Sequence, residues 1–120
     1  MSVGYELVNE TKRETICFAH LPVSTLSEIY ANPVSATLVC WYMAENLGDE
    51  IKFVSDTYDD WPFVASTRND FCNFKDVTEE SLDILFKLGF LVDDGFEYQD
   101  KDEPNSVFIR SVKLGGKTET

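Results

Sequence analysis

Two short apolar runs separated by a polar segment open the chain. Residues 5–8 (YELV) and 15–20 (TICFAH) are rich in aromatic and β-branched side chains, and residues 9–13 between them are polar. Short runs of this kind, bounded by turn-forming residues, are typical of paired strands. The pattern therefore predicts that the chain begins with a β-hairpin.

Two capping patterns predict helices after this hairpin. Thr25 and Glu28 have the spacing of a capping box, which predicts a short helix over residues 25–30. Asn32 and Pro33 predict a second start, because Asn caps free amide groups and Pro fits the first helical position. The second helix should continue to Gly48, which suits a left-handed stop. Its apolar residues cover most of its circumference, so we expect it to be buried at the centre of the core.

The second half of the chain alternates between strand and helix patterns. Residues 51–55 (IKFVS) predict a strand. Residues 64–77 are expected to be irregular, with a helical turn near 70–74. Residues 79–88 predict a helix that is capped by Thr78 and ends at Gly89. Asp94-Gly95 lies between apolar residues, and Gly accepts the positive φ of a tight hairpin turn, so a hairpin is expected there. Residues 106–114 predict the last strand.

The predicted order is β-β-α-α-β-α-β-β-β. It indicates a single α+β domain over residues 1–114, with a mainly antiparallel sheet, about three helices and a flexible tail over 115–120. The length of 120 residues and the apolar content of 43% suit one core. The N-terminus lacks the apolar segment of a signal peptide and no apolar run reaches membrane-spanning length, so we expect a cytoplasmic protein.

Negative charge is concentrated in the second half of the chain. The formal net charge is −12, and residues 49–103 contain 16 acidic and five basic side chains. A field of this sign repels phosphate backbones and attracts basic proteins. Acidity also keeps proteins soluble, so charge alone does not decide between these uses.

The residue types for nucleophilic or metal chemistry are present without a recognisable spacing. Cys17, Cys40, Cys72 and the single His20 form neither a CxxC motif nor a paired zinc pattern. In a strand, Cys17 and His20 would point to opposite faces and could not form a dyad. These residues are expected to be structural, and no cofactor or metal is predicted. A small carboxylate-dependent or divalent-metal-dependent enzyme is the alternative, because a carboxyl group buried beside aromatic rings can act as a general acid.

The segment DTYDDWPF (residues 56–63) is the main candidate site. Pro62 cannot donate to a ladder, so the segment should leave the sheet as a loop. Trp and Tyr are frequent interface hot spots, and carboxylates beside them complement Lys or Arg. A second acidic segment spans residues 93–103. The candidate partner-binding residues are Asp56, Tyr58, Asp59, Asp60, Trp61, Asp93, Asp94 and Glu97. In the competing interpretation the aromatic residues are core anchors and the aspartates are only solvated.

The segment 81–112 resembles the end of a winged helix-turn-helix, in which a helix leads into a β-hairpin. A DNA-binding protein of this kind carries Lys or Arg on that helix. Here the helix has three acidic residues, Glu79, Glu80 and Asp83, and one basic residue, Lys87. This resemblance implies a regulatory subunit that acts through protein contacts and not through direct nucleic-acid binding. A nucleic-acid mimic, whose carboxylates would stand in for phosphates, is a further alternative. The sequence as a whole favours an acidic binding protein that neutralises or regulates a basic partner such as a nuclease toxin, in the manner of an inhibitor or immunity protein.

Overall fold

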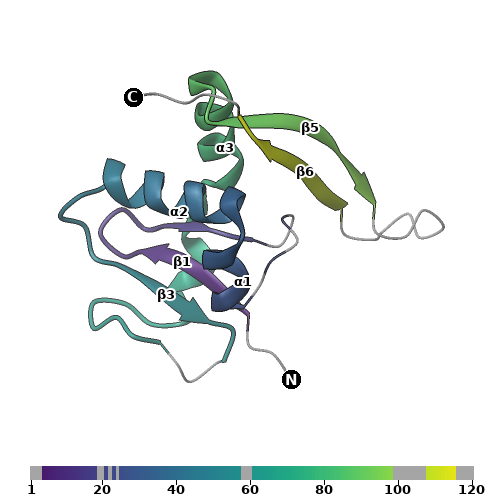
Figure 1. The fold of residues 1–120 in the computed structure, drawn as a ribbon. Coiled ribbons are helices and arrows are strands. Elements are labelled where there is room, and N and C mark those ends of the chain that lie inside the picture. The colour runs from purple at the N-terminus through teal and green to yellow at the C-terminus, as the bar shows by residue number, and fades with distance from the viewer. Residues whose placement is uncertain are drawn as a thin grey trace.

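Three helices and two sheets make up the described part of the chain. The computed structural model describes residues 4–18, 21, 23, 25–57, 61–98 and 108–115 (Figure 1). In chain order the elements are β1 (Tyr5–Asn9), β2 (Glu14–Ile16), α1 (Leu26–Ala31), α2 (Pro33–Glu45), β3 (Ile51–Ser55), the 3-10 turn η1 (Asp70–Asn73), β4 (Lys75–Asp76), α3 (Thr78–Leu88), β5 (Leu91–Tyr98) and β6 (Phe108–Leu114). The predicted α+β class with a mainly antiparallel sheet is confirmed.

The main sheet has the strand order β3-β1-β2-β4. Strand β1 is central and pairs antiparallel with β2 and β3, so that Leu7 lies opposite both Ile16 and Phe53. The two-residue strand β4 adds to β2 in parallel. The sequence did not predict β4, because Lys75 and Asp76 are both exposed and carry no apolar alternation.

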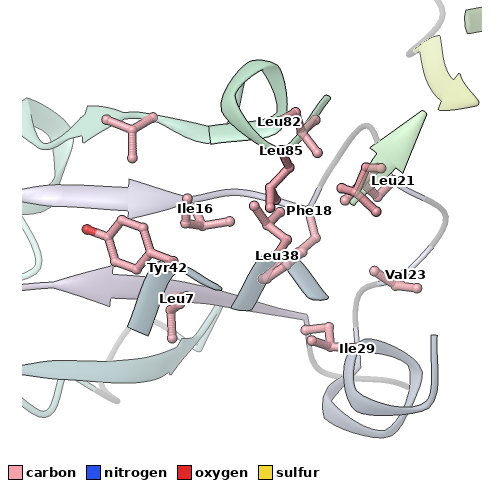
Figure 2. Close-up of a cluster of buried hydrophobic side chains, with 12 residues drawn as sticks. Leu7, Ile16, Phe18, Leu21, Val23, Ile29, Leu38, Tyr42, Leu82 and Leu85 are labelled. Carbon is pink, nitrogen blue, oxygen red and sulfur yellow. The ribbon is translucent and has the colours of Figure 1, made fainter. Parts of the chain in front are cut away.

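The helices cover one face of this sheet. Leu7 and Ile16 point from the strands toward Leu38 and Tyr42 of α2, as Figure 2 shows, and Leu82 and Leu85 of α3 complete the cluster. Side chains on alternate positions of a strand point to the same face, which is why residues 5 and 7 of β1 join this core while 6 and 8 do not. This face therefore holds the principal core.

A second, smaller core lies on the opposite face. Val8 and Val54 are covered there by Phe63 and Phe74, with Trp61 and Phe71 partly buried at the edge. The covering residues come from segment 61–74, which contains the short 3-10 turn η1, and not from an α-helix. The aromatic residues of that segment thus substitute for a helical layer on the second face of the sheet.

The capping patterns were read correctly for the first two helices. Thr25 and Glu28 form a reciprocal capping box on α1, and the Asn32 side chain accepts hydrogen bonds from the amides of Val34 and Ser35. Thr78 differs from its prediction: it is the first residue of α3, and its amide donates to the Asp76 carboxylate at 2.9 Å. Gly89 ends α3 in the left-handed region, as expected.

Helix α2 is less buried than its composition suggested. One line of side chains, Ser35, Leu38 and Tyr42, faces the core. The opposite stripe remains largely exposed, because the sheet and α3 cover only part of the circumference: Cys40 is exposed and Met43 is 42% exposed. Leu47, in the turn after the helix, is 84% exposed. An apolar stripe of α2 is thus left without a cover among the described residues.

The tight hairpin predicted at Asp94-Gly95 is wrong. Strand β5 continues through both residues and pairs antiparallel with β6, and a register irregularity between Asp93 and Phe96 accommodates them. Gly95 does adopt the positive φ that it was expected to have, here at 90° in an irregular ladder and not in a turn. In the described residues, two strands (β3 and β4) therefore lie between α2 and α3 and two follow α3, where the pattern predicted one and three.

The β5–β6 ribbon, called the arm below, extends away from the main sheet (Figure 1). Its base is fixed where β6 ends: the Gly115 amide donates to the Phe90 carbonyl at 2.8 Å. Gly115 was predicted as the start of a flexible tail but is anchored by this bond, and residues 116–120 lie outside the described residues.

Candidate functional site

The acidic loop, residues 56–63, leaves the sheet at the end of β3. Asp56 is exposed and its Oδ2 accepts a hydrogen bond from the Gly4 amide at 3.3 Å. Tyr58, Asp59 and Asp60 lie outside the described residues. The structure therefore places one of the three loop carboxylates at the surface and does not describe the other two.

Trp61 lies at the edge of the second core. Its Nε1 donates to the Ser66 carbonyl at 3.0 Å, and its ring centroid lies 5.3 Å from that of Phe63 and from that of Phe71. The Arg68 guanidinium lies over the same indole, at 5.4 Å from the ring centroid. These contacts make Trp61 an anchor of the loop, and a basic side chain of this chain already contacts its ring.

The second predicted segment lies on the arm. Asp93 and Asp94 are exposed, and Asp94 forms an ion pair of 3.1 Å with Lys113 on the facing strand. Glu97 belongs to β5 and pairs with Ile109 through the backbone, and its side chain lies outside the described residues. Strand β3 and the arm lie on different sides of the molecule in Figure 1, so the structure does not bring the two predicted segments together.

A groove rimmed by carboxylates, which sequence reasoning did not identify, runs between α2 and α3. This acidic groove has a volume of about 400 Å³ and is lined by Glu14, Trp41, Tyr42, Glu45, Asn46, Lys75, Val77, Glu80, Ser81 and Ile84. Three acids surround a partly apolar floor, and the single cation, Lys75, pairs with Glu80 at 3.1 Å. An ion pair between two exposed side chains contributes little, so a competing cation can displace Lys75 at small cost.

A buried polar network holds one wall of the acidic groove. The Asn9 side chain is fully buried, and its Nδ2 donates to the Tyr42 hydroxyl at 3.1 Å and to Asp49 at 2.9 Å. Tyr42 in turn donates to Glu14 at 2.6 Å. Burial and the hydrogen bond to Glu14 raise the pKa of Tyr42 well above its usual range, so this hydroxyl stays a donor at all physiological pH values. Glu14 and Tyr42 are therefore held in place.

An apolar pocket of about 490 Å³ lies on the other side of Trp41. Its lining residues are Ala36, Thr37, Cys40, Trp41, Leu85 and Phe90. Trp41 thus contributes to both the acidic groove and the apolar pocket. Its Nε1 is buried and has no hydrogen-bond partner among the described residues. A buried donor without an acceptor costs roughly 1–3 kcal/mol, so stability alone does not explain an indole at this position.

A small pocket on the second face of the sheet contains a perturbed carboxyl group. It has a volume of about 180 Å³, and Glu6, Cys17 and Asp56 are among its lining residues. Burial raises the pKa of Glu6 above its usual range, while a hydrogen bond from Thr15 at 3.2 Å opposes the shift. Glu6 is partly buried, and its pocket is lined by residues from the start of β1, the end of β3 and the segment after β2.

The described residues hold no group of three or more His, Cys, Asp or Glu side chains that could bind a metal ion. Cys17, Cys40 and Cys72 form no disulfide within the described ranges, and His20 lies outside them. Within the described ranges, no helix is long and apolar enough to span a membrane.

Comparisons with known proteins add no family to this description. A scan against protein-family models and searches of curated proteins and of solved structures gave no match.

Proposed function

We propose that this chain is a cytoplasmic acidic binding protein that neutralises or regulates a basic protein partner, as an inhibitor or immunity-type protein does. The observation that carries the proposal is the imbalance of exposed charge. Between residues 49 and 95, three basic side chains are described as exposed, Lys52, Lys75 and Lys87. Eight acidic side chains there are exposed: Glu50, Asp56, Asp76, Glu79, Glu80, Asp83, Asp93 and Asp94.

Two of the three exposed cations are already engaged within the chain. Lys52 pairs with Glu50 at 3.6 Å and Lys75 pairs with Glu80 at 3.1 Å. The surplus carboxylates give a surface that steers a cationic protein inward and disfavours nucleic acid. Exposed apolar side chains close to them, such as Ile84 and Phe90, supply area that a partner can bury.

The test is capture of the partner at two salt concentrations, followed by binding measurements with the purified protein. A tagged chain should retain one basic protein in a stoichiometric amount from the source cell's lysate, and the affinity should fall as salt rises. Failure to retain any basic protein at either salt concentration overturns the proposal. Two charge-reversal variants, Asp59→Lys with Asp60→Lys and Asp93→Lys with Asp94→Lys, then test the two segments that the sequence named.

The Glu6 pocket supports a second candidate, a small carboxylate-dependent enzyme. A carboxyl group with a raised pKa beside the thiol of Cys17 and the exposed Asp56 is an arrangement that can move a proton. In this case a divalent ion or a small ligand should raise the melting temperature of the wild type but not of Glu6→Gln. The absence of such a ligand across Mg²⁺, Mn²⁺, Ca²⁺ and Zn²⁺ would remove the metal-dependent form of this candidate.

A further inference from the structure

We propose that the surface around Trp41, made of the apolar pocket and the acidic groove, is the docking site for an amphipathic, positively charged helix of the partner. The inference rests on the proposed function and names the contact surface, which the sequence had placed on the acidic loop and the arm.

The first argument is the uncovered stripe on α2. Ala36, Cys40 and Met43 recur at helical spacing on the side of α2 that points away from the buried line, and the last two are exposed. The exposed Leu47 follows in the turn after the helix. From Ala36 to its last residue, Glu45, α2 extends about 15 Å, which matches a partner helix of several turns. A helix lying along such a stripe buries it more completely than a single side chain can.

The second argument is the change of chemistry across Trp41. On one side lies the apolar pocket, whose lining includes Leu85 and Phe90. On the other lies the acidic groove with Glu45 and Glu80. Apolar side chains of the partner helix would enter the pocket while its Lys or Arg side chains reach the carboxylates. An amphipathic cationic helix is the element that presents both chemistries in parallel.

A second copy of this chain does not fit as the occupant. Helix α1 contains Glu28 and no basic residue, α2 contains Glu45 and no basic residue, and α3 has three acids against Lys87. None of the described helices therefore offers a cationic face, and two chains with a formal net charge of −12 repel each other. The complementary helix has to come from a different, basic protein.

The test uses a synthetic peptide of about 18 residues, or five helical turns, built from Leu on one face and Lys on the other. The matched control peptide replaces every Lys by Glu. Titration calorimetry at physiological salt should show binding of the Lys peptide only. In the ¹⁵N-labelled protein the indole signal of Trp41 should shift, whereas that of Trp61, whose Nε1 is already bonded to Ser66, should stay in place.

Variants separate this surface from the rest of the molecule. Cys40→Arg fills the apolar pocket with a cation and should weaken the Lys peptide by about tenfold or more, as expected for a central contact. The matched control is Cys72→Arg, the same change at an exposed cysteine of η1, which should leave the affinity nearly unchanged. Glu45→Lys with Glu80→Lys should abolish binding, whereas Asp93→Lys with Asp94→Lys changes the net charge equally and should have a small effect.

Each other outcome has a definite meaning. If both charge-reversed double variants lost the same affinity for the Lys peptide, net charge alone would attract the peptide. The proposal of a docking site around Trp41 would then be overturned. The Trp41 docking site would also be overturned if the indole signal of Trp61 shifted and that of Trp41 did not. Failure of the Lys peptide to bind would overturn it as well. These results leave the proposed function in place if the captured basic partner still binds, so the two proposals fail separately.

Discussion

The partly buried carboxyl group of Glu6 should make the stability of the protein depend on pH. Its pKa is raised in the folded protein, so between the unfolded and the folded pKa the native state binds more protons than the unfolded state. The free energy of unfolding should therefore decrease as pH rises from about 4.5 through the folded pKa. Glu6→Gln removes this dependence and should be more stable relative to wild type at pH 7 than at pH 4, as urea denaturation at several pH values would show.

The control for Glu6 is Glu45→Gln, the same change at an exposed carboxylate at the end of α2. In that variant the free energy of unfolding should depend on pH as it does in the wild type. If Glu6→Gln shows the same slope as the wild type, burial does not perturb Glu6 and the second candidate function loses its main support.

Asn9 is the residue on which the wall of the acidic groove depends. It is fully buried, its Nδ2 donates to Tyr42 and Asp49, and its Oδ1 accepts from the Lys12 amide at 3.0 Å. Asn9→Ala should lower the free energy of unfolding by about 2–3 kcal/mol, because buried polar groups lose their partners. Chemical denaturation measures this. Asn73→Ala, at an exposed position of η1, should change it by less than about 0.5 kcal/mol.

At the scale of elements, the sequence predicts what a few neighbouring residues determine, and it does not predict what long-range pairing determines. The capping box of Thr25, the cap of Asn32 and the stop at Gly89 are encoded within a few residues, so the helices could be predicted. The continuous strand β5 could not be predicted, because Asp94-Gly95 favours a turn locally and only the pairing of β5 with β6 overrides this local preference.

The candidate surface around Trp41 was beyond sequence reasoning for the same physical reason. The apolar pattern of α2 suggested burial on all sides, and only the tertiary arrangement shows which stripe stays uncovered. Trp41, Glu80 and Phe90 are far apart in the chain and meet through the packing of α2, α3 and the start of β5. The loop aromatics show the reverse case: Phe63 and Trp61 lie in the second core, as the competing interpretation expected.

The arm depends on a close approach between two backbones at its base. A Cβ at Gly115 would lie 2.0 Å from the Gly89 carbonyl oxygen, which no side chain can tolerate without a backbone shift. Gly115→Ala should therefore cost about 1–3 kcal/mol and speed hydrogen exchange of the β5 and β6 amides more than that of β1. Leu114→Ala, a neighbouring change at an exposed position, should leave the exchange pattern of the arm intact. Unchanged exchange in Gly115→Ala would show that the arm is not held at this point.

At the scale of the whole molecule, charge repulsion opposes folding and salt should relieve it. The chain has 22 acidic and 10 basic residues. The ion pairs Lys52–Glu50, Lys75–Glu80 and Lys113–Asp94 join exposed side chains and contribute at most about 1 kcal/mol each. Repulsion among the surplus carboxylates should therefore outweigh them. The melting temperature at pH 7 should rise by several degrees, about 4–6 °C per kcal/mol for a domain of this size, as NaCl screens the charges.

A neutralised variant provides the control for this salt dependence. Asp83 lies one helical turn from Glu79 and Glu80 on α3, so Asp83→Asn removes like-charge repulsion that salt would otherwise screen. Its melting temperature should exceed that of the wild type at low salt, and the difference should shrink as NaCl is added. A melting temperature that falls with added NaCl would mean that the ion pairs dominate. The acidic surface would then be a stabilising network within the chain, and it would no longer argue for a basic partner.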